Sequence, residues 1–466
     1  MAGIGFELTK LSRRDDLLGT MGAYMHSAMA IAGPWLFTVV ALALITIMHG
    51  GSGDDLEILN FRGVIIYNFS FSLVLAAPIF MVMTRYLADA IHVENVTKAP
   101  SVMIESLLLT YLLQLPIAIL FYVIYFELPL ELRLAAFANM FLISSVWLLG
   151  VFLTALKDYN AISKTFFFGM VIAVGASYLM EGYGAFGMVM GFNIGLTVVV
   201  FALIARIMAE YPYKLTNEFA LKPYFRKYRE LALGGLFYNA AIWIDKWVMW
   251  FAPEAVELPS KMIFYQDYDS AMFLAFLTII PSLALFVFSV ETHFFRHYRR
   301  FYEQILAHAP MVRLRQYQSE ITESIFAGGR NLIFLQGAIC FVVILLAPRI
   351  FDFFNMFFMQ LGMFRLGTLG ALFHVLLVFE CIILSYFDCR KATMNIYLFF
   401  MATNAIFTYI AMDAGFAYYG YGYFLSAAIS FILAGFVLAS HVRKLAFHSF
   451  ITNNTSIRPR MKKIEV

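Results

Sequence analysis

The sequence predicts an all-α membrane protein with twelve transmembrane helices in two lobes of six. The chain of 466 residues is 62% hydrophobic and 14% charged, whereas soluble domains average about 45–50% apolar and about 25% charged residues. The apolar residues gather in continuous runs of about 20, which is the length that crosses a bilayer as a helix. A long polar segment at 210–230 separates the first six runs from the last six. This composition excludes a soluble enzyme, a disordered chain and a nucleic-acid-binding protein.

The twelve apolar runs set the predicted elements of the fold. In chain order, the predicted spans are 22–48, 61–84, 103–126, 134–156, 163–181, 185–209, 231–252, 270–292, 330–348, 366–388, 393–412 and 421–441. Most of the 33 lysines and arginines fall in alternate segments between the spans, beginning with the N-terminus. Because basic loops are retained in the cytoplasm, we expect both termini to be cytoplasmic.

The segments between the spans complete the predicted organisation. The expected parts are a cytoplasmic amphipathic segment at 1–21, an N-lobe at 22–209, a cytoplasmic linker at 210–230, a C-lobe at 231–441 with a cytoplasmic amphipathic segment at 293–329, and a cytoplasmic tail at 442–466. None of the loops is long enough for a folded domain, and the chain has no GxxxxGK[ST] phosphate loop and no metal-ligand cluster. We therefore expect a transporter without enzymatic activity, cofactor or metal, whose substrate path lies between two similar halves.

Two charged residues, Asp245 and Lys246, lie side by side inside the seventh span. A charge at the centre of a span costs about 2.5–3.5 kcal/mol on insertion scales. Each such residue is therefore expected to have a function that offsets this cost. Adjacent helical residues point about 100° apart, so these two need not pair with each other. We expect both to contact the transported substrate.

Aromatic residues surround this pair on the same span. Trp243, Trp247 and Trp250 form a stripe with Lys246, while Tyr238 shares a face with Asp245 and Asn239 shares one with Lys246. Aromatic faces stack on sugar rings and charges bond hydroxyl groups, so this wall is a candidate substrate path for a sugar polymer. Alternatively, the tryptophans belong to an interfacial belt and Lys246 extends its ammonium toward water.

Two further spans carry candidate residues. The tenth contains His374, Glu380 and Asp388, which are candidates for coupling or gating, because ionisable residues in spans often relay protons. The alternative is that they form hydrogen bonds between helices. The sequence Gly33-Pro34-Trp35 is expected to interrupt the first span midway, and broken helices often mark substrate sites. Prolines are also common in ordinary spans.

The segment 293–306 has apolar residues at helical spacing, with Arg296, Arg299 and Arg300 on the opposite face. This pattern predicts an amphipathic helix that lies on the inner leaflet, where anionic lipids attract arginines. The alternative is a docking surface for a cytoplasmic partner.

Several long stretches together resemble one family. They are MAGIGFELTKLSRRDDLL at the start, IAGPW in the first span, GLFYNAAIWIDKW in the seventh, YDSAMFLAFLTIIPSLALF from residue 268, and ILSYFDCRK near residue 383. Together they resemble the PelG family of Pel exopolysaccharide transporters, from residue 1 to about residue 440. The chain departs from the expected pattern at residues 29–32, Met-Ala-Ile-Ala, where small residues including serine are expected.

The resemblance implies more than the residues themselves. It implies a flippase-like (MATE-like) architecture in the bacterial inner membrane, with two six-helix lobes around a central cavity into which Asp245, Lys246 and the tryptophans would face. It implies export of a polysaccharide rich in N-acetylgalactosamine to the periplasm, for a biofilm matrix. The implied partners are the cytoplasmic glycosyltransferase PelF and the membrane proteins PelD and PelE. Two alternatives stay open, namely an ion-coupled antiporter for small cations that uses Asp245 or Glu380, and a membrane scaffold for the synthase.

Overall fold

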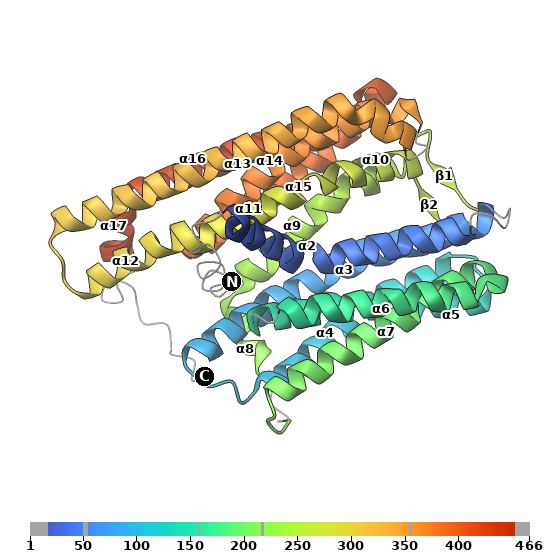
Figure 1. Cartoon of the computed structure of the whole chain (residues 1–466), viewed down its shortest axis with the longest axis horizontal. Coiled ribbons are helices and arrows are strands. Elements are labelled where there is room, and N and C mark those ends of the chain that lie inside the picture. The colour runs from blue at the N-terminus through green and yellow to red at the C-terminus, as the bar shows by residue number, and fades with distance from the viewer. Residues whose placement is uncertain (1–16, 50–54, 157–158, 216–218, 354–356, 453–466) are drawn as a thin grey trace. The chain divides into compact units, whose positions relative to one another are not determined.

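A computed structural model of the chain describes residues 17–49, 55–156, 159–215, 219–353 and 357–452. Within these residues the chain is almost entirely helical, and a short hairpin of two strands is the exception (Figure 1). Residues 453–466 of the predicted cytoplasmic tail at 442–466 lie outside the described residues. So do residues 1–16 of the predicted amphipathic segment at 1–21.

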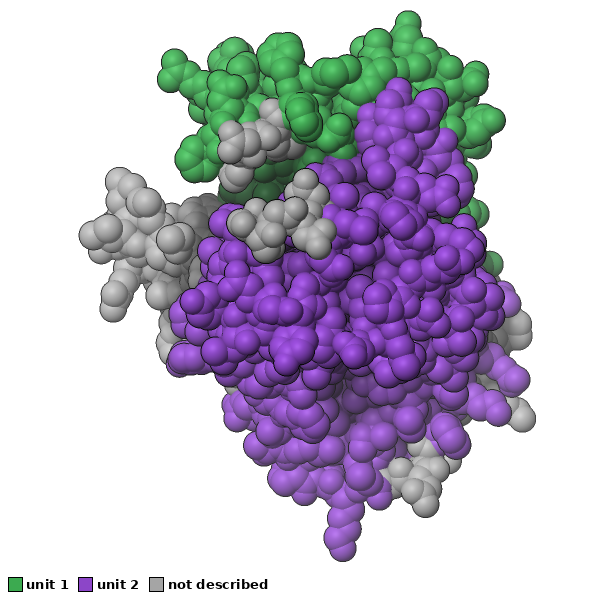
Figure 2. Space-filling model, turned by 90° about the vertical axis from the view of Figure 1, so that its right-hand side faces the viewer, with its two compact units in different colours: residues 1–31, 267–466 green, residues 32–266 purple. Residues whose placement is uncertain are grey.

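Contacts divide the chain into two compact units (Figure 2). Unit 1 comprises residues 1–31 and 267–466, and unit 2 comprises residues 32–266. The sequence predicted a division at 210–230, so the unit boundary differs from the predicted lobe boundary. The helix at 229–249, which contains Asp245, packs along the helix at 55–92. It therefore belongs to the same unit as the residues before the 210–230 loop, because a long loop does not always separate two packing units.

Unit 2 consists mainly of long helices. Its elements are α2 (Leu17–His49, which begins in unit 1), α3 (Asp55–His92), α4 (Ala99–Ile119), the π-helix η1 (Leu120–Tyr125), α5 (Leu130–Leu156), α6 (Tyr159–Leu179), η2 (Glu181–Tyr183), α7 (Gly184–Glu210), α8 (Leu221–Lys227), α9 (Arg229–Met249), β1 (Val256–Glu257) and β2 (Ile263–Phe264). The two strands pair antiparallel, with Val256 opposite Phe264. Lys261, between the strands, forms an ion pair with Glu127 at 2.5 Å, which ties the hairpin to the segment between η1 and α5.

Unit 1 is likewise built from helices. Its elements are α10 (Gln266–Leu277), α11 (Ile280–Ser289), the π-helix η3 (Val290–Phe294), α12 (Phe295–Leu306), α13 (Met311–Phe353), η4 (Phe358–Gln360), α14 (Leu361–Tyr386), α15 (Arg390–Ala414), η5 (Phe416–Tyr418), α16 (Tyr421–Arg443), α17 (Leu445–Phe447) and η6 (His448–Thr452). At 43 residues, α13 is about 64 Å long, so the predicted span 330–348 lies within a helix that extends well beyond a bilayer core.

Ten helices in the described part of the chain are long and apolar enough to cross a membrane. They coincide with all the predicted spans except the first and the seventh. The first corresponds to α2, of which Gly33–His49 is a shorter apolar helix, and the seventh corresponds to α9. The all-α membrane fold is confirmed, and twelve spans are consistent with these helices.

Small residues bring the helices of unit 2 close together. A Cβ placed on Gly191 of α7 would lie 2.4 Å from the Cα of Ser177 of α6, and one on Gly195 would lie 2.4 Å from the Cβ of Ala173. These glycines let the two helix backbones approach, as small residues do at interfaces between membrane helices.

Buried amides connect α3 and α5 to α7 in the same unit. Asn68 of α3 donates to the side chain of Asn139 of α5 at 2.8 Å, and Asn139 donates to Asn193 of α7 at 2.7 Å. Tyr122 of η1 donates to Asn68 at 2.6 Å. Interhelical hydrogen bonds of this kind average only about 0.6 kcal/mol each in a membrane protein. Because these bonds form one connected chain, together they help to hold the helices in their relative positions.

The fold corrects the expectation for the first span. Gly33-Pro34-Trp35 does not interrupt α2, which is continuous from Leu17 to His49. The hydroxyl of Thr38 donates to the carbonyl of Pro34 at 2.9 Å, and membrane helices accommodate proline when such side chains satisfy the backbone.

Part of the apolar face of α12 packs on protein in unit 1. Phe301 is fully buried, and the Tyr298 hydroxyl donates at 2.9 Å to the carbonyl of Tyr386, at the C-terminal end of α14. The helical pattern was predicted correctly. Leu306 on the same face is 80% exposed, so the predicted contact with the inner leaflet stays a prediction. Arg296, Arg299 and Arg300 remain exposed on the other face.

Candidate transport site on α9

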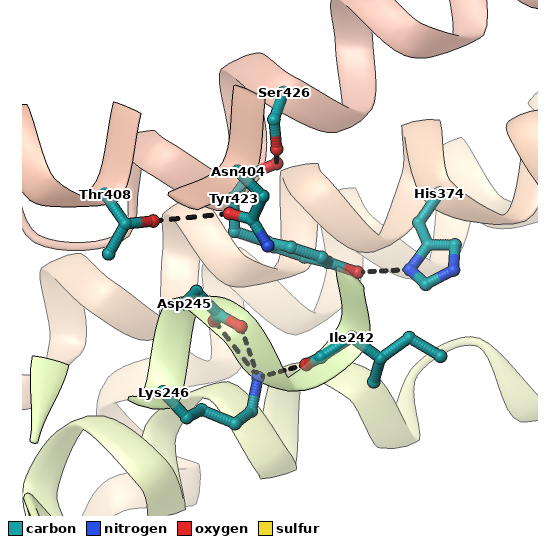
Figure 3. A network of polar contacts seen from close by, with 8 residues as sticks. All are labelled: Ile242, Asp245, Lys246, His374, Asn404, Thr408, Tyr423 and Ser426. Atoms are coloured by element: carbon teal, nitrogen blue, oxygen red, sulfur yellow. Dashed lines mark hydrogen bonds and ion pairs between the residues drawn. The ribbon is translucent and has the colours of Figure 1, made fainter. Parts of the chain in front are cut away.

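Asp245 and Lys246 form an ion pair on α9, although adjacent helical side chains diverge (Figure 3). The Lys246 ammonium donates to both Asp245 carboxylate oxygens, at 3.1 and 3.0 Å, and to the Ile242 carbonyl at 3.0 Å. The Asp245 side chain is fully buried and that of Lys246 is 13% exposed. The flexible lysine stem folds back along the helix, so the pair presents one nearly neutral, strongly dipolar group.

The three tryptophans of α9 have different surroundings. The Trp243 ring lies 6.0 Å from the Lys246 ammonium, within the range of a cation–π contact. Trp247 stacks on Phe71 of α3, with centroids 4.8 Å apart and an interplanar angle of 12°. Trp250 is buried and lies 4.6 Å from the Tyr67 ring. Trp247 and Trp250 therefore also join α9 to α3, and their predicted contact with substrate stays a prediction.

Two indole donors on this helix are left without an acceptor among the described residues. The ring N–H groups of Trp243 and Trp247 are both buried and form no hydrogen bond there. A buried donor without an acceptor costs about 1–3 kcal/mol. A sugar hydroxyl or a water molecule at these positions would recover that free energy.

The other two residues predicted on α9 differ in burial, and their predicted contact with substrate stays a prediction. Asn239 is buried and its amide donates to the Gly235 carbonyl, one turn back on the same helix, at 2.8 Å. Tyr238 is half-buried. Near Gly33 on α2, the Ser163 hydroxyl of α6 would lie 3.5 Å from an added Cβ, so that part of α2 packs against α6.

Sequence reasoning missed the aromatic residues of α3 and η1. Tyr67, Phe71 and Phe121 pack with Trp247 and Trp250, and the Phe71 and Phe121 rings are 4.8 Å apart. Tyr67 and Phe71 are four residues apart, a spacing that puts them on one helix face. This spacing of aromatic residues could have indicated the cluster from the sequence. It is not distinctive, however, because the chain contains 50 phenylalanines and similar spacings recur by chance.

In unit 1, His374 lies in a hydrogen-bonded pair between helices. Its Nδ1 is 2.7 Å from the Tyr423 hydroxyl of α16 (Figure 3). The centroid of the Phe400 ring is 5.4 Å from that of the His374 ring. Nearby in the same unit, Thr408 donates to Asn404 at 3.2 Å along α15. This geometry fits the interhelical hydrogen bonding that the sequence left open as an alternative.

Glu380 and Asp388, the other two candidates of the tenth span, differ in their surroundings. Glu380 lies within α14 against Gly435 of α16, and its Oε2 is buried without a hydrogen-bond partner among the described residues. Asp388 lies after the end of α14, in a turn with a φ of 57°, and pairs with Arg390 at 2.9 Å. Of the two, Glu380 alone lies within the apolar span.

Solved structures of transporters share the fold of this chain. A MOP superfamily transporter from Pyrococcus furiosus matches with a TM-score of 0.63 and 13% identity, covering 91% of this chain and 96% of that one. An outward-facing multidrug resistance MATE family transporter matches with a TM-score of 0.64 and 15% identity, covering 90% and 96%. The inward-facing form of such a transporter matches with a TM-score of 0.61 and 14% identity, covering 90% and 99%. At these identities the likeness establishes the fold.

Comparison with sequence families identifies the chain more closely. The comparison with curated proteins gave no match. Residues 1–450, in contrast, match the PelG family of exopolysaccharide exporters (EPS-E). The match covers nearly the whole chain and agrees with the transporter fold. The chain therefore belongs to the PelG exopolysaccharide exporter family and is a membrane exopolysaccharide transporter.

Proposed function

We propose that this transporter carries a Pel-type polysaccharide, rich in N-acetylgalactosamine, from the cytoplasm to the periplasm. It would lie in the bacterial inner membrane with both termini in the cytoplasm, as the distribution of basic residues indicates. The observation that carries the proposal is the family match over residues 1–450. The proposal is transport without catalysis on the polymer, which the match to an exporter family supports.

The proposed path runs past α9. The Asp245–Lys246 pair offers both acceptors and donors to sugar hydroxyls, and the indole N–H groups of Trp243 and Trp247 offer two more donors. The ring of Trp243, beside the lysine, offers a face on which a sugar ring can stack. A neutral polymer of hydroxyl and amide groups matches this mixture of donors, acceptors and ring faces.

The proposed partners are the glycosyltransferase PelF and the membrane proteins PelD and PelE, and the proposed docking surface is the exposed face of α12. Arg299 there already pairs with Glu303 at 2.7 Å, which leaves Arg296 and Arg300 as the stronger candidates. Replacing Arg296, Arg299 and Arg300 by glutamine should reduce the amount of PelF that copurifies with the transporter. Unchanged copurification would exclude this face.

Secretion by cells that lack the gene is the decisive test of the function. We expect secreted polysaccharide to be lost, with polymer or precursor retained in the cytoplasm. Complementation with Asp245→Asn should fail, whereas Asp413→Asn, an exposed aspartate on α15, should restore secretion. Normal secretion by the deletion strain would refute the proposal, and loss of all polymer would favour a scaffold for the synthase.

A second candidate function is ion-coupled antiport of small cations. It is favoured by the unpartnered carboxylate oxygen of Glu380 within α14 and by the multidrug transporters of the same fold. The test is uptake of a fluorescent cation such as ethidium into vesicles with an imposed proton gradient. Gradient-dependent uptake that is lost in Glu380→Gln would support antiport, and its absence in the wild type would exclude it.

A further inference from the structure

A groove of about 460 Å³ lies in unit 1 between the beginning of α13 and the segment that joins α16 to α17. We call it the basic groove, because three cations line it: Arg315, Arg443 and Lys444. Gln318 holds its two sides together by donating to the Val442 carbonyl at 2.8 Å. The groove is therefore formed by segments that are hydrogen-bonded to each other.

The charges in the basic groove are not balanced. None of its lining residues is acidic, and within the described chain Arg315, Arg443 and Lys444 form no ion pair. Arg443 is the last residue of α16 and Lys444 caps that helix, where the helix dipole favours cations. Arg315 joins them from the second turn of α13. An anion among the three would relieve their mutual repulsion.

Apolar side chains border the same groove. Phe447 is 52% exposed and Met311 is 48% exposed. A second hollow of about 450 Å³ shares Ser319 and Thr322 with the first. It continues along α13 past Phe326, which is 72% exposed, toward the apolar stretch of that helix.

The second hollow has its own charges, and they balance. Glu323 and Arg330 both line it, so it carries one acid and one base. The excess of positive charge is thus confined to the basic groove, and the second hollow offers a mainly apolar continuation. A ligand that fits both would have an anionic head and an apolar tail.

We propose that the basic groove binds an anionic phospholipid, with its phosphate between Arg315, Arg443 and Lys444 and an acyl chain beside Phe447 and Phe326. Basic pockets between membrane helices are suited to anionic lipid head groups. The chain's own tail is an unsuitable occupant, because residues 453–466 contain four lysines and arginines and one glutamate. An acidic peptide would satisfy the cations but would leave the apolar border unused.

The test is lipid binding by the purified full-length protein in neutral detergent, measured by native mass spectrometry with phosphatidylglycerol and phosphatidylethanolamine. A basic side chain near an anionic lipid surface contributes about fivefold in affinity, and three contribute on the order of a hundredfold. We expect retained phosphatidylglycerol, weaker binding by about fivefold in Arg315→Gln or Lys444→Gln, and near loss in the triple variant Arg315→Gln/Arg443→Gln/Lys444→Gln. Phosphatidylethanolamine should bind no better to the wild type than to the triple variant.

The matched control removes the same charge elsewhere. Lys214→Gln/Lys222→Gln/Arg226→Gln changes three exposed cations of unit 2, and it should retain phosphatidylglycerol as the wild type does. Equal binding by the wild type and the groove variants would overturn the proposal. So would displacement of phosphatidylglycerol by millimolar inorganic phosphate, which would indicate a simple anion site, or by an acidic peptide, which would indicate a protein partner. The single variants decide the question if the triple variant does not fold.

Discussion

Replacing Lys246 by methionine would leave the carboxylate of Asp245 without the ammonium that contacts both of its oxygens. Asp245 is fully buried, and removal of one partner from a buried pair costs about 3–5 kcal/mol. We expect Lys246→Met to shift the unfolding equilibrium by roughly a hundredfold to a few thousandfold. The double variant Asp245→Asn/Lys246→Met leaves no buried charge, so its stability should return to within about 1 kcal/mol of the wild type.

The assay combines stability with export. Thermal unfolding in detergent, followed by fluorescence-detected gel filtration, measures stability, and secreted polysaccharide in a deletion strain measures export. Asp413→Asn/Lys391→Met removes one exposed charge of each sign from α15 and serves as the matched control, with an expected change of less than about 0.5 kcal/mol.

The double variant then separates structure from transport. Recovered stability without export would mean that the charges contact the polymer, as proposed. Recovery of both would mean that the pair only stabilises α9. Wild-type stability in Lys246→Met would refute the reasoning itself, because removing one member of a buried ion pair is expected to be costly.

Three further predictions concern the helices and the cysteines. Glu57→Gln should lower the free energy of unfolding by about 1–2 kcal/mol in a thermal assay, because its carboxylate accepts from the backbone N–H of Ala185 at 2.6 Å, at the N-terminus of α7. Gly191→Leu should destabilise by about 3 kcal/mol or more in the same assay, because its Cβ would lie 2.4 Å from Ser177. Burial and the nearby Asp388 raise the pKa of the Cys389 thiol to about 11. Alkylation of Cys389 in a Cys340→Ala/Cys381→Ala background should therefore be slow at pH 7.5 and should rise about tenfold per pH unit toward that value, since the thiolate is the reactive form.

Each of these predictions has a control within the chain. Glu181→Gln changes an exposed carboxylate beside the same helix end and should be neutral. A Cβ added at Gly182 meets nothing within 4 Å, so Gly182→Leu should be tolerated, and equal destabilisation by both glycine variants would contradict the packing argument. Alkylation of Cys389 that levels off near pH 8.5 would contradict the effect of burial on its pKa.

Hydropathy predicted the spans because it is a local property: a run of apolar residues crosses the membrane whichever helix it packs against. The partners of each helix are not local. Periodicity does not indicate that part of the apolar side of α12 covers the end of α14, since lipid and protein require the same pattern. The unit boundary after residue 266 reflects the packing of α9 along α3, in which Trp247 stacks on Phe71, a residue far away in the chain.

The pairing of Asp245 with Lys246 was missed for a different reason. The angle of about 100° between neighbouring side chains applies to the Cβ directions, whereas the lysine ammonium lies at the end of a flexible four-carbon stem. That stem lets the ammonium reach the carboxylate and the Ile242 carbonyl together. Directional arguments from helix geometry hold for short side chains and fail for lysine.

The same pair bears on which substrate the transporter carries. An antiporter of cations needs a carboxylate for which the proton and the substrate compete. Asp245 already holds a cation from its own chain, at 3.0 Å, so a cationic substrate would have to displace Lys246 and leave a second positive charge beside itself. A polysaccharide hydroxyl can instead bond to the pair without breaking it. The chemistry of α9 therefore favours the polymer over the small cation, and it leaves Glu380 as the residue on which an antiport mechanism would depend.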